Sequence, residues 1–250
     1  MRIIISPAKK MNVDTDSFAC HDLPQLLPRT EQLCARLREM SYEELKVLWK
    51  CNDRITALNF ARLQTMDLYH HLTPAILSYE GIQYQYMAPG VFTYDELDYV
   101  QDHLRILSGF YGVLRPFDGV TPYRLEMQAR LPMGAAKDLY SFWGDEIARL
   151  LFSETDCIIN LASQEYSRCV SAYLSQDTQF ITVLFCERKN GKLIEKGTLC
   201  KMARGEMVRY MAEHQIEDPD AIKSFDRLGY RYAPEASDQT TYMFIKEKVP

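Results

Sequence analysis

Residues 107–127, with the sequence LSGFYGVLRPFDGVTPYRLEM, cannot form one ordinary helix or strand, because glycine and proline recur throughout the segment. Pro116 and Pro122 fix the backbone at two points, and each favours an extended conformation at the residue before it. The glycines allow other groups to approach the backbone closely. The segment therefore predicts a stiff, irregular turn region that can hold side chains in fixed positions.

Two arginines, Arg115 and Arg124, are attached to this stiff backbone. Their planar side chains can bind a phosphate or a carboxylate with little further ordering. The same arginines can instead pair inside the protein with Asp118 and Glu126, which would only stabilise a turn. The segment alone leaves both interpretations open.

Short apolar segments elsewhere in the chain predict β-strands. The β-branched runs at residues 2–5 and 157–162 are typical of buried strands, and residues 75–81 also have strand character before a glycine. Asn190-Gly191 lies between two strand-like runs, which is a strong signal for a β-hairpin. Two further strands are expected near the C-terminus, at YRYAP and TYMFIKE.

Residues 30–65 carry the signals of three short helices. Thr30, Ser41 and either Asn52 or Asp53 can each cap the start of one helix. A glutamate three residues after Ser41 completes a capping box. The turns between these helices are very short, so we expect a compact helical hairpin in this part of the chain.

Helices are also expected in three later segments. A second capping box, Thr93 with Glu96, predicts a helix over residues 94–107. Apolar spacing predicts two more, over residues 138–152 and 201–214. Helices and strands are mixed without a steady alternation, so the predicted fold class is α+β or mixed α/β. No linker or repeat divides the sequence, and we expect residues 1–250 to form a single domain.

Composition excludes several classes of protein. No apolar run approaches the roughly 20 residues needed to cross a bilayer, so a membrane is not an expected partner. The N-terminal MRIIISPAKK lacks the apolar core of a signal peptide, which leads us to expect a cytoplasmic protein. The seven cysteines are scattered and form no C-x-x-C motif. We therefore expect reduced thiols, no metal site and no cofactor.

The charge distribution allows a local anion-binding site although the net charge is −5. Lys9 and Lys10 follow the first predicted strand, at a position where α/β proteins commonly bind ligands. Lys201 and Arg204 lie near the start of a predicted helix, and the N-terminus of a helix favours anions. Any of these cations taken alone could equally be a solvated surface charge.

Uncharged polar residues and one carboxylate also follow the predicted strands. Ser6 ends the first strand, and Ser163 follows the strand at 157–162, where it can cap a helix that starts at the next residue. Glu165 and Tyr166 are candidate polar groups of a site, and an ordinary helix start explains them equally well. No histidine or G-x-S-x-G motif supports Ser163 as a nucleophile, so the catalytic residues, if any, stay unknown.

Five segments taken together resemble the YaaA family, the peroxide-stress resistance proteins of bacteria. The segments are ISPAKKM at 5–11, the whole of 107–127, KDLYSFWGD at 137–145, NLASQEYS at 160–167 and ARGEMVRYM at 203–211. The resemblance implies a single mixed α/β domain of unusual topology, described for the family as a cantaloupe fold. It also implies a positively charged cleft that binds DNA and a cytoplasmic role that limits damage when peroxide and iron coexist. A helix-hairpin-helix element is implied too, and it would fall in residues 44–63, whose turn CNDR has no glycine.

Three hypotheses for function follow. In the first, the protein binds double-stranded or structured DNA in the peroxide stress response and contacts phosphates through six cations. These are Lys9, Lys10, Arg115, Arg124, Lys201 and Arg204. In the second, the same cleft belongs to an enzyme of unknown reaction that acts on a nucleotide or nucleic acid. In the third, the motifs only shape the fold.

Overall fold

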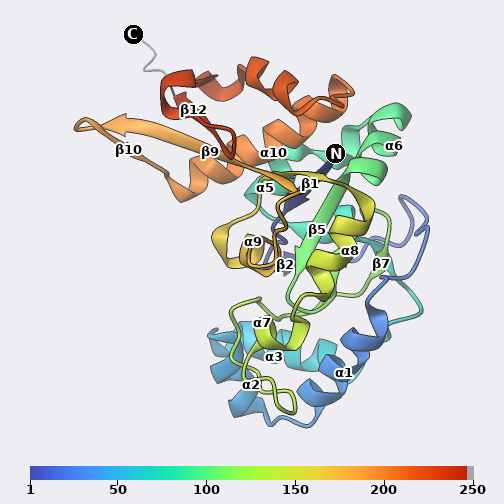
Figure 1. Cartoon of the computed structure of the whole chain (residues 1–250). Coiled ribbons are helices and arrows are strands. Elements are labelled where there is room, and N and C mark those ends of the chain that lie inside the picture. Colours follow the sequence, from blue (N-terminus) through green and yellow to red (C-terminus); the bar gives the residue numbers. More distant parts are fainter. Residues whose placement is uncertain (247–250) are drawn as a thin grey trace.

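A mixed β-sheet forms the centre of the protein in the computed structural model, which describes residues 1–246 (Figure 1). Four neighbouring parallel strands occupy its middle, in the order β9 (Gln179–Lys189), β8 (Cys157–Asn160), β1 (Arg2–Ile5) and β5 (Leu104–Ser108). On one side, β6 (Gly112–Leu114) pairs antiparallel with β5. On the other side come β12 (Thr241–Lys246), which is parallel to β9, and β11 (Tyr230–Tyr232). The predicted mixed α/β class is confirmed.

Strand β1 is buried on both faces, and Ile3, Ile4 and Ile5 are all 0% exposed. A parallel strand covered by helices on both sides needs apolar residues at consecutive positions, as in this strand. Helices α5 (Ile82–Met87), α6 (Tyr94–His103) and α10 (Gly197–Glu213) pack together. Helices α8 (Glu146–Glu154) and α9 (Gln164–Ser171) form a second group in front of the sheet (Figure 1).

The remaining helices and strands complete the architecture. The other helices are α1 (Leu27–Arg38), α2 (Tyr42–Trp49), α3 (Asp53–Gln64), α4 (Ala75–Ser78) and α7 (Leu139–Trp143). Two-residue strands pair outside the main sheet, β2 (Lys10–Met11) with β4 (Tyr79–Glu80) and β3 (Thr73–Pro74) with β7 (Gly119–Val120). Strand β10 (Lys192–Ile194) pairs with the end of β9, and this hairpin projects from the body (Figure 1).

Helices α1, α2 and α3 occupy residues 27–64 and contain the predicted helical hairpin. Ser41 and Glu44 form the expected capping box of α2, and the side chain of Asn52 caps α3. The prediction for Thr30 was wrong, because α1 already begins at Leu27. Thr30 lies inside the helix, fully buried, and its hydroxyl donates to the carbonyl oxygen of Phe110 at 3.1 Å.

Two predicted elements have a different structure. The helix that starts at Thr93 ends at His103, and residues 104–108 form strand β5 instead of continuing the helix. This stretch is wholly buried and pairs with β1, so contacts distant in sequence override the helical pattern. Residues 75–81 contain the single-turn helix α4 followed by β4, where we expected one strand.

Two other predicted helices have different boundaries. Residues 138–152 form α7 and α8, which are separated at Gly144 because this residue has a positive φ of 51°. Helix α10 begins at Gly197, four residues before the predicted start. Lys201 and Arg204 therefore lie within the helix, beyond its first turn.

Candidate functional site

The order of the parallel strands creates a topological switch point beside β1. The chain passes from β1 to β5 on one side and returns to β8 on the other, so the connections leave β1 and β8 in opposite directions. Open α/β sheets bind ligands at such points, outside the carboxyl ends of the strands. The residues that follow β1 and β8 line a pocket of about 420 Å³ there.

Nine of the ten side chains predicted as candidate site residues line this pocket. They are Ser6, Lys9, Lys10, Arg124, Ser163, Glu165, Tyr166, Lys201 and Arg204. These residues come from four regions that are far apart in sequence: the segment after β1, the 107–127 segment, the start of α9 and helix α10. Arg115 does not line the pocket.

Two serines join the ends of β1 and β8 at the pocket. The backbone N–H of Ser163 donates to Ser6 Oγ at 2.8 Å, and the two hydroxyl oxygens are 3.2 Å apart. Ser163 is the residue before α9, as predicted, but its side chain makes no capping hydrogen bond among the described residues. Its hydroxyl interacts with Ser6 instead, so the pair fixes the distance between the two strand ends.

The pocket lining carries more positive than negative charge. Five lysines and arginines line it against three carboxylates, Glu80, Glu126 and Glu165. Lys10 pairs with Glu80 at 2.5 Å, and Arg124 Nε lies 2.9 Å from Glu126 Oε1. Within residues 1–246, Lys201 has no carboxylate within ion-pair distance. This local excess of positive charge stands in contrast to the net charge of −5.

Buried hydrogen-bond donors without an acceptor also line the pocket. Gln83 is 6% exposed, and its Nε2 has no hydrogen-bond partner in the described part of the chain. The same holds for Nε of Arg124 and of Arg204, although Glu126 and Glu195 lie close enough to form ion pairs with them. Buried polar groups are nearly always hydrogen-bonded, so these donors are free to bind an acceptor. Unpaired buried donors also occur outside this pocket, on Arg29, Trp49 and Arg115.

Glu165 is a pocket carboxylate whose pKa is raised by its surroundings. Burial raises the pKa of its side chain, and the negative charge of Glu126 adds to this effect. The backbone N–H of Gln128, which donates at 3.3 Å, and the charge of Lys9 oppose the shift. Glu165 therefore keeps its proton to a higher pH than an exposed glutamate.

Sequence reasoning missed several residues of the pocket, above all Gln83, Tyr84 and Tyr123. Tyr84 donates to the carbonyl oxygen of Ser6 at 3.0 Å, and Tyr123 shares a buried hydroxyl network with Tyr79 and Ser108. Tyr123 belongs to the 107–127 segment, so its position there was a usable signal. Gln83 lies on the short helix α5, and no local pattern distinguishes it from an ordinary helical residue.

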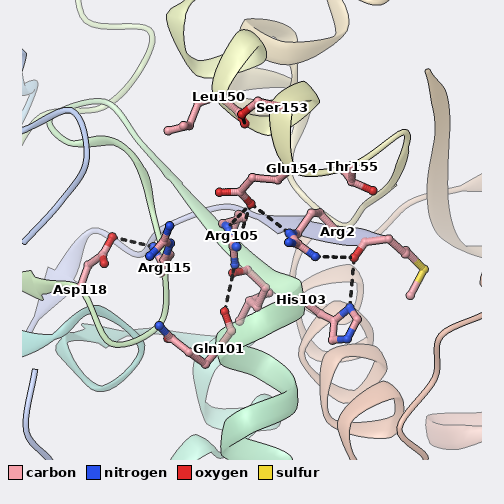
Figure 2. Close-up of polar contacts among 12 residues, drawn as sticks. Arg2, Gln101, His103, Arg105, Arg115, Asp118, Leu150, Ser153, Glu154 and Thr155 are labelled. Carbon is pink, nitrogen blue, oxygen red and sulfur yellow. Dashed lines mark hydrogen bonds and ion pairs between the residues drawn. The ribbon is translucent and has the colours of Figure 1, made fainter. Parts of the chain in front are cut away.

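Arg115 lies in a separate polar cluster, shown in Figure 2. Its backbone N–H donates to Asp118 Oδ2 at 2.8 Å, and its Nη1 is 3.6 Å from Asp22 Oδ2. Nearby, Arg2 and Arg105 share the carboxylate of Glu154 at 2.9 and 2.7 Å. Arg115 thus fits the internal-pair interpretation, whereas Arg124 both pairs with a carboxylate and lines the pocket.

The hairpin of α2 and α3 is also separate from the pocket. Its turn contains Lys50, with a left-handed φ of 47°, where a glycine would be unstrained. Lys46 pairs with Asp53 at 2.6 Å across the turn. The assignment of residues 44–63 as a DNA-binding helix-hairpin-helix stays a prediction.

The described residues contain neither a metal-ligand group nor a membrane-spanning helix. Within residues 1–246, no three His, Cys, Asp or Glu side chains gather as a metal ion would require. No helix in this range is long and apolar enough to cross a bilayer.

Comparison with known proteins places the chain in a family. Residues 1–236 match the family described as peroxide stress protein YaaA. A UPF0246 protein of Agathobacter rectalis is 56% identical over 247 residues, which is 99% of each chain. UPF0246 proteins of Lachnoclostridium phytofermentans and Lactiplantibacillus plantarum are 54% and 53% identical, over 98% of this chain and 96% and 99% of theirs. The chain therefore belongs to the peroxide stress protein YaaA family, whose name supports a role in peroxide stress.

Proposed function

We propose that the protein acts in peroxide stress as a cytoplasmic DNA-binding protein, with the pocket at β1 and β8 at the centre of its DNA contact. One observation carries this proposal: cations from three separate segments converge on one pocket. They are Lys9, Lys10, Arg124, Lys201 and Arg204. Lysines and arginines that neutralise phosphates supply most of the affinity of proteins for DNA.

The same contacts suggest how DNA binding limits iron-driven damage. DNA phosphates hold a condensed layer of cations, and a protein that neutralises phosphates releases them. Iron held in this layer would leave the covered DNA, so its reaction with peroxide would occur farther from the bases. The protein needs no iron ligands of its own in this mechanism.

The test is a salt titration of duplex DNA binding by fluorescence anisotropy. The variant Lys9→Ala/Lys10→Ala/Lys201→Ala removes three exposed cations of the pocket rim. The affinity should fall, and the slope of log K against log salt should become shallower by about 0.9 for each phosphate that the variant no longer neutralises. Unchanged affinity and slope would refute DNA binding at this site.

A matched control removes three cations that do not line the pocket, Arg36, Lys137 and Arg149. The change in net charge is the same in both variants. If long-range attraction alone determined affinity, the two triple variants would weaken binding equally. We expect the control to bind almost as tightly as the unmodified protein.

A second candidate function is an enzyme that acts on a nucleotide or nucleic acid in the same pocket. The raised pKa of Glu165, which lines the same pocket as the Ser6–Ser163 pair, favours it, because groups with perturbed pKa values cluster at catalytic sites. Nucleotides and damaged DNA should be screened for turnover. Activity that Glu165→Gln abolishes without loss of binding would support catalysis, and no turnover across the panel would favour binding alone.

A further inference from the structure

We propose that the pocket encloses a single nucleoside phosphate, with its phosphate beside Arg124 and Arg204 and its ring system beside Tyr84 and Tyr123. This inference deepens the proposed function, on which it rests, by naming the chemical class of ligand that the same pocket takes. The cations at the rim would contact DNA phosphates from outside. The interior would hold one nucleotide unit.

The size of the pocket fits a small molecule. Its volume of about 420 Å³ lies within the range of roughly 300–1,000 Å³ that is typical of small-molecule sites. A duplex is far too wide to enter, so duplex DNA can contact only the rim. The interior must serve a different, smaller group.

The unpaired donors define the polar part of this group. Arg204 Nε is buried and has no hydrogen-bond acceptor among residues 1–246. Arg124 Nε lies 2.9 Å from Glu126 Oε1, but the two atoms are not aligned as a hydrogen bond requires. The side chains of Glu126 and Glu195 neutralise part of the arginine charge but leave these two N–H groups unsatisfied. A phosphate supplies several acceptor oxygens and negative charge together, and arginine binds it through paired N–H groups.

The apolar part of the lining defines the rest of the ligand. The hydroxyl groups of Tyr84 and Tyr123 are already bonded within the protein, to Ser6 and to Tyr79 and Ser108. Tyr84 and Tyr123 are only 4% and 7% exposed, so a small part of each ring is open to the pocket. A base would contact that part without stacking on a full ring face.

The buried Gln83 completes the match. Gln83 lines the pocket, and its buried Nε2 donor needs an acceptor such as a ring nitrogen or carbonyl oxygen of a base. Inorganic phosphate would leave this amide without a partner. A nucleoside would leave the arginines without one. A nucleoside phosphate satisfies both halves of the pocket.

The experiment is isothermal titration calorimetry of the full chain with the four deoxynucleoside 5′-monophosphates. The corresponding nucleosides and inorganic phosphate are titrated as separate probes. At least one monophosphate should bind about tenfold more tightly than either of its parts alone. Failure of all four monophosphates to bind, or equally tight binding of inorganic phosphate, would overturn the proposal.

The variant Gln83→Glu replaces the buried donor with a carboxylate and should weaken monophosphate binding by about tenfold or more. Its matched control is Gln85→Glu, which makes the same change at an exposed position of the same helix. Thermal melts report whether both variants fold. If Gln83→Glu does not fold, Arg124→Lys keeps the charge, removes the Nε donor and should give the same loss. Unchanged binding in a folded pocket variant contradicts the proposal.

Competition identifies the source of the nucleotide. If the ligand is an unpaired nucleotide of DNA, the monophosphate will displace a duplex that contains one unpaired nucleotide more readily than a fully paired duplex. If the ligand is a free nucleotide, it will displace both duplexes to the same small extent. Duplex binding without monophosphate binding would refute only this inference. Monophosphate binding without duplex binding would refute only the proposed DNA-binding function.

Discussion

The 107–127 segment places two arginines, nine positions apart, in two different environments. Arg124 lines the pocket, where five cations face three carboxylates. Arg115 lies in the cluster of Figure 2, where the three arginines Arg2, Arg105 and Arg115 lie close to three acidic residues. The acidic residues are Asp22, Asp118 and Glu154. The comparison shows that the same residue type lies among as many acidic as basic residues in one environment and within an excess of cations in the other.

The largest expected effect is a loss of stability in the cluster of Figure 2. Glu154→Gln removes the charge that Arg2 and Arg105 share, and the side chain of Arg105 is only 6% exposed. An unpaired buried charge is costly, so the free energy of unfolding should fall by about 3 kcal/mol. Urea denaturation measures this change. A loss below about 0.5 kcal/mol would show that the cluster is not what stabilises this side of the sheet.

The second test makes the same substitution at each of the two arginines and compares the effects. Arg124→Gln should weaken binding of a duplex that contains one unpaired nucleotide by about tenfold, because it removes a cation proposed to hold the phosphate of that nucleotide in the pocket. Arg115→Gln should leave binding unchanged and lower the free energy of unfolding by about 1 kcal/mol. Fluorescence anisotropy measures DNA binding, and urea denaturation measures the free energy of unfolding, for both variants. Our comparison fails if Arg115→Gln is the variant that loses DNA binding.

The third test uses pH. Burial raises the pKa of Asp118 from an ordinary value of 3.8 to about 7, and Asp22 adds to the shift, while Arg115 and Arg105 oppose it. Between these values the folded state holds a proton that the unfolded state releases, so this carboxyl lowers stability as pH rises from about 4 to about 7. Asp118→Asn should therefore show a smaller loss of stability over this range. Parallel pH profiles for the variant and the unmodified protein would count against this account.

The smallest effect is expected in the α2–α3 hairpin. Lys46 is paired with Asp53, and the turn offers no glycine amides to a phosphate. Arg54→Ala should therefore change duplex affinity by less than about twofold. A larger loss, together with a shallower salt slope, would show that DNA extends from the pocket to this hairpin and would support a helix-hairpin-helix contact.

Local sequence signals correctly predicted helix starts and turns that depend on residues close together in the sequence. The capping box of Ser41 and Glu44 and the Asn190-Gly191 turn depend on residues within one turn of each other. Residues 104–107 were predicted as the end of a helix, because the capping box of Thr93 and Glu96 marks its start and Gly109 follows. Their pairing with β1, a strand about 100 positions away in sequence, decides their conformation instead.

The candidate site shows the same limit of prediction from local sequence signals. Lys9, Lys10 and Ser163 were predicted from their positions after strands, and they do line the pocket. Gln83 could not be predicted, because its significance depends on which donors remain without acceptors after folding. A missing hydrogen-bond acceptor depends on how distant segments pack, so no local pattern in the sequence indicates it.

The sequence by itself determined the family, the mixed fold class and the stiff segment that carries Arg115 and Arg124. Only the tertiary structure decided that these arginines lie apart, Arg115 in the cluster of Figure 2 and Arg124 at the pocket. The reason is physical. Residue type fixes the charge that a side chain carries, but the charges and acceptors around it come from distant segments that folding brings together.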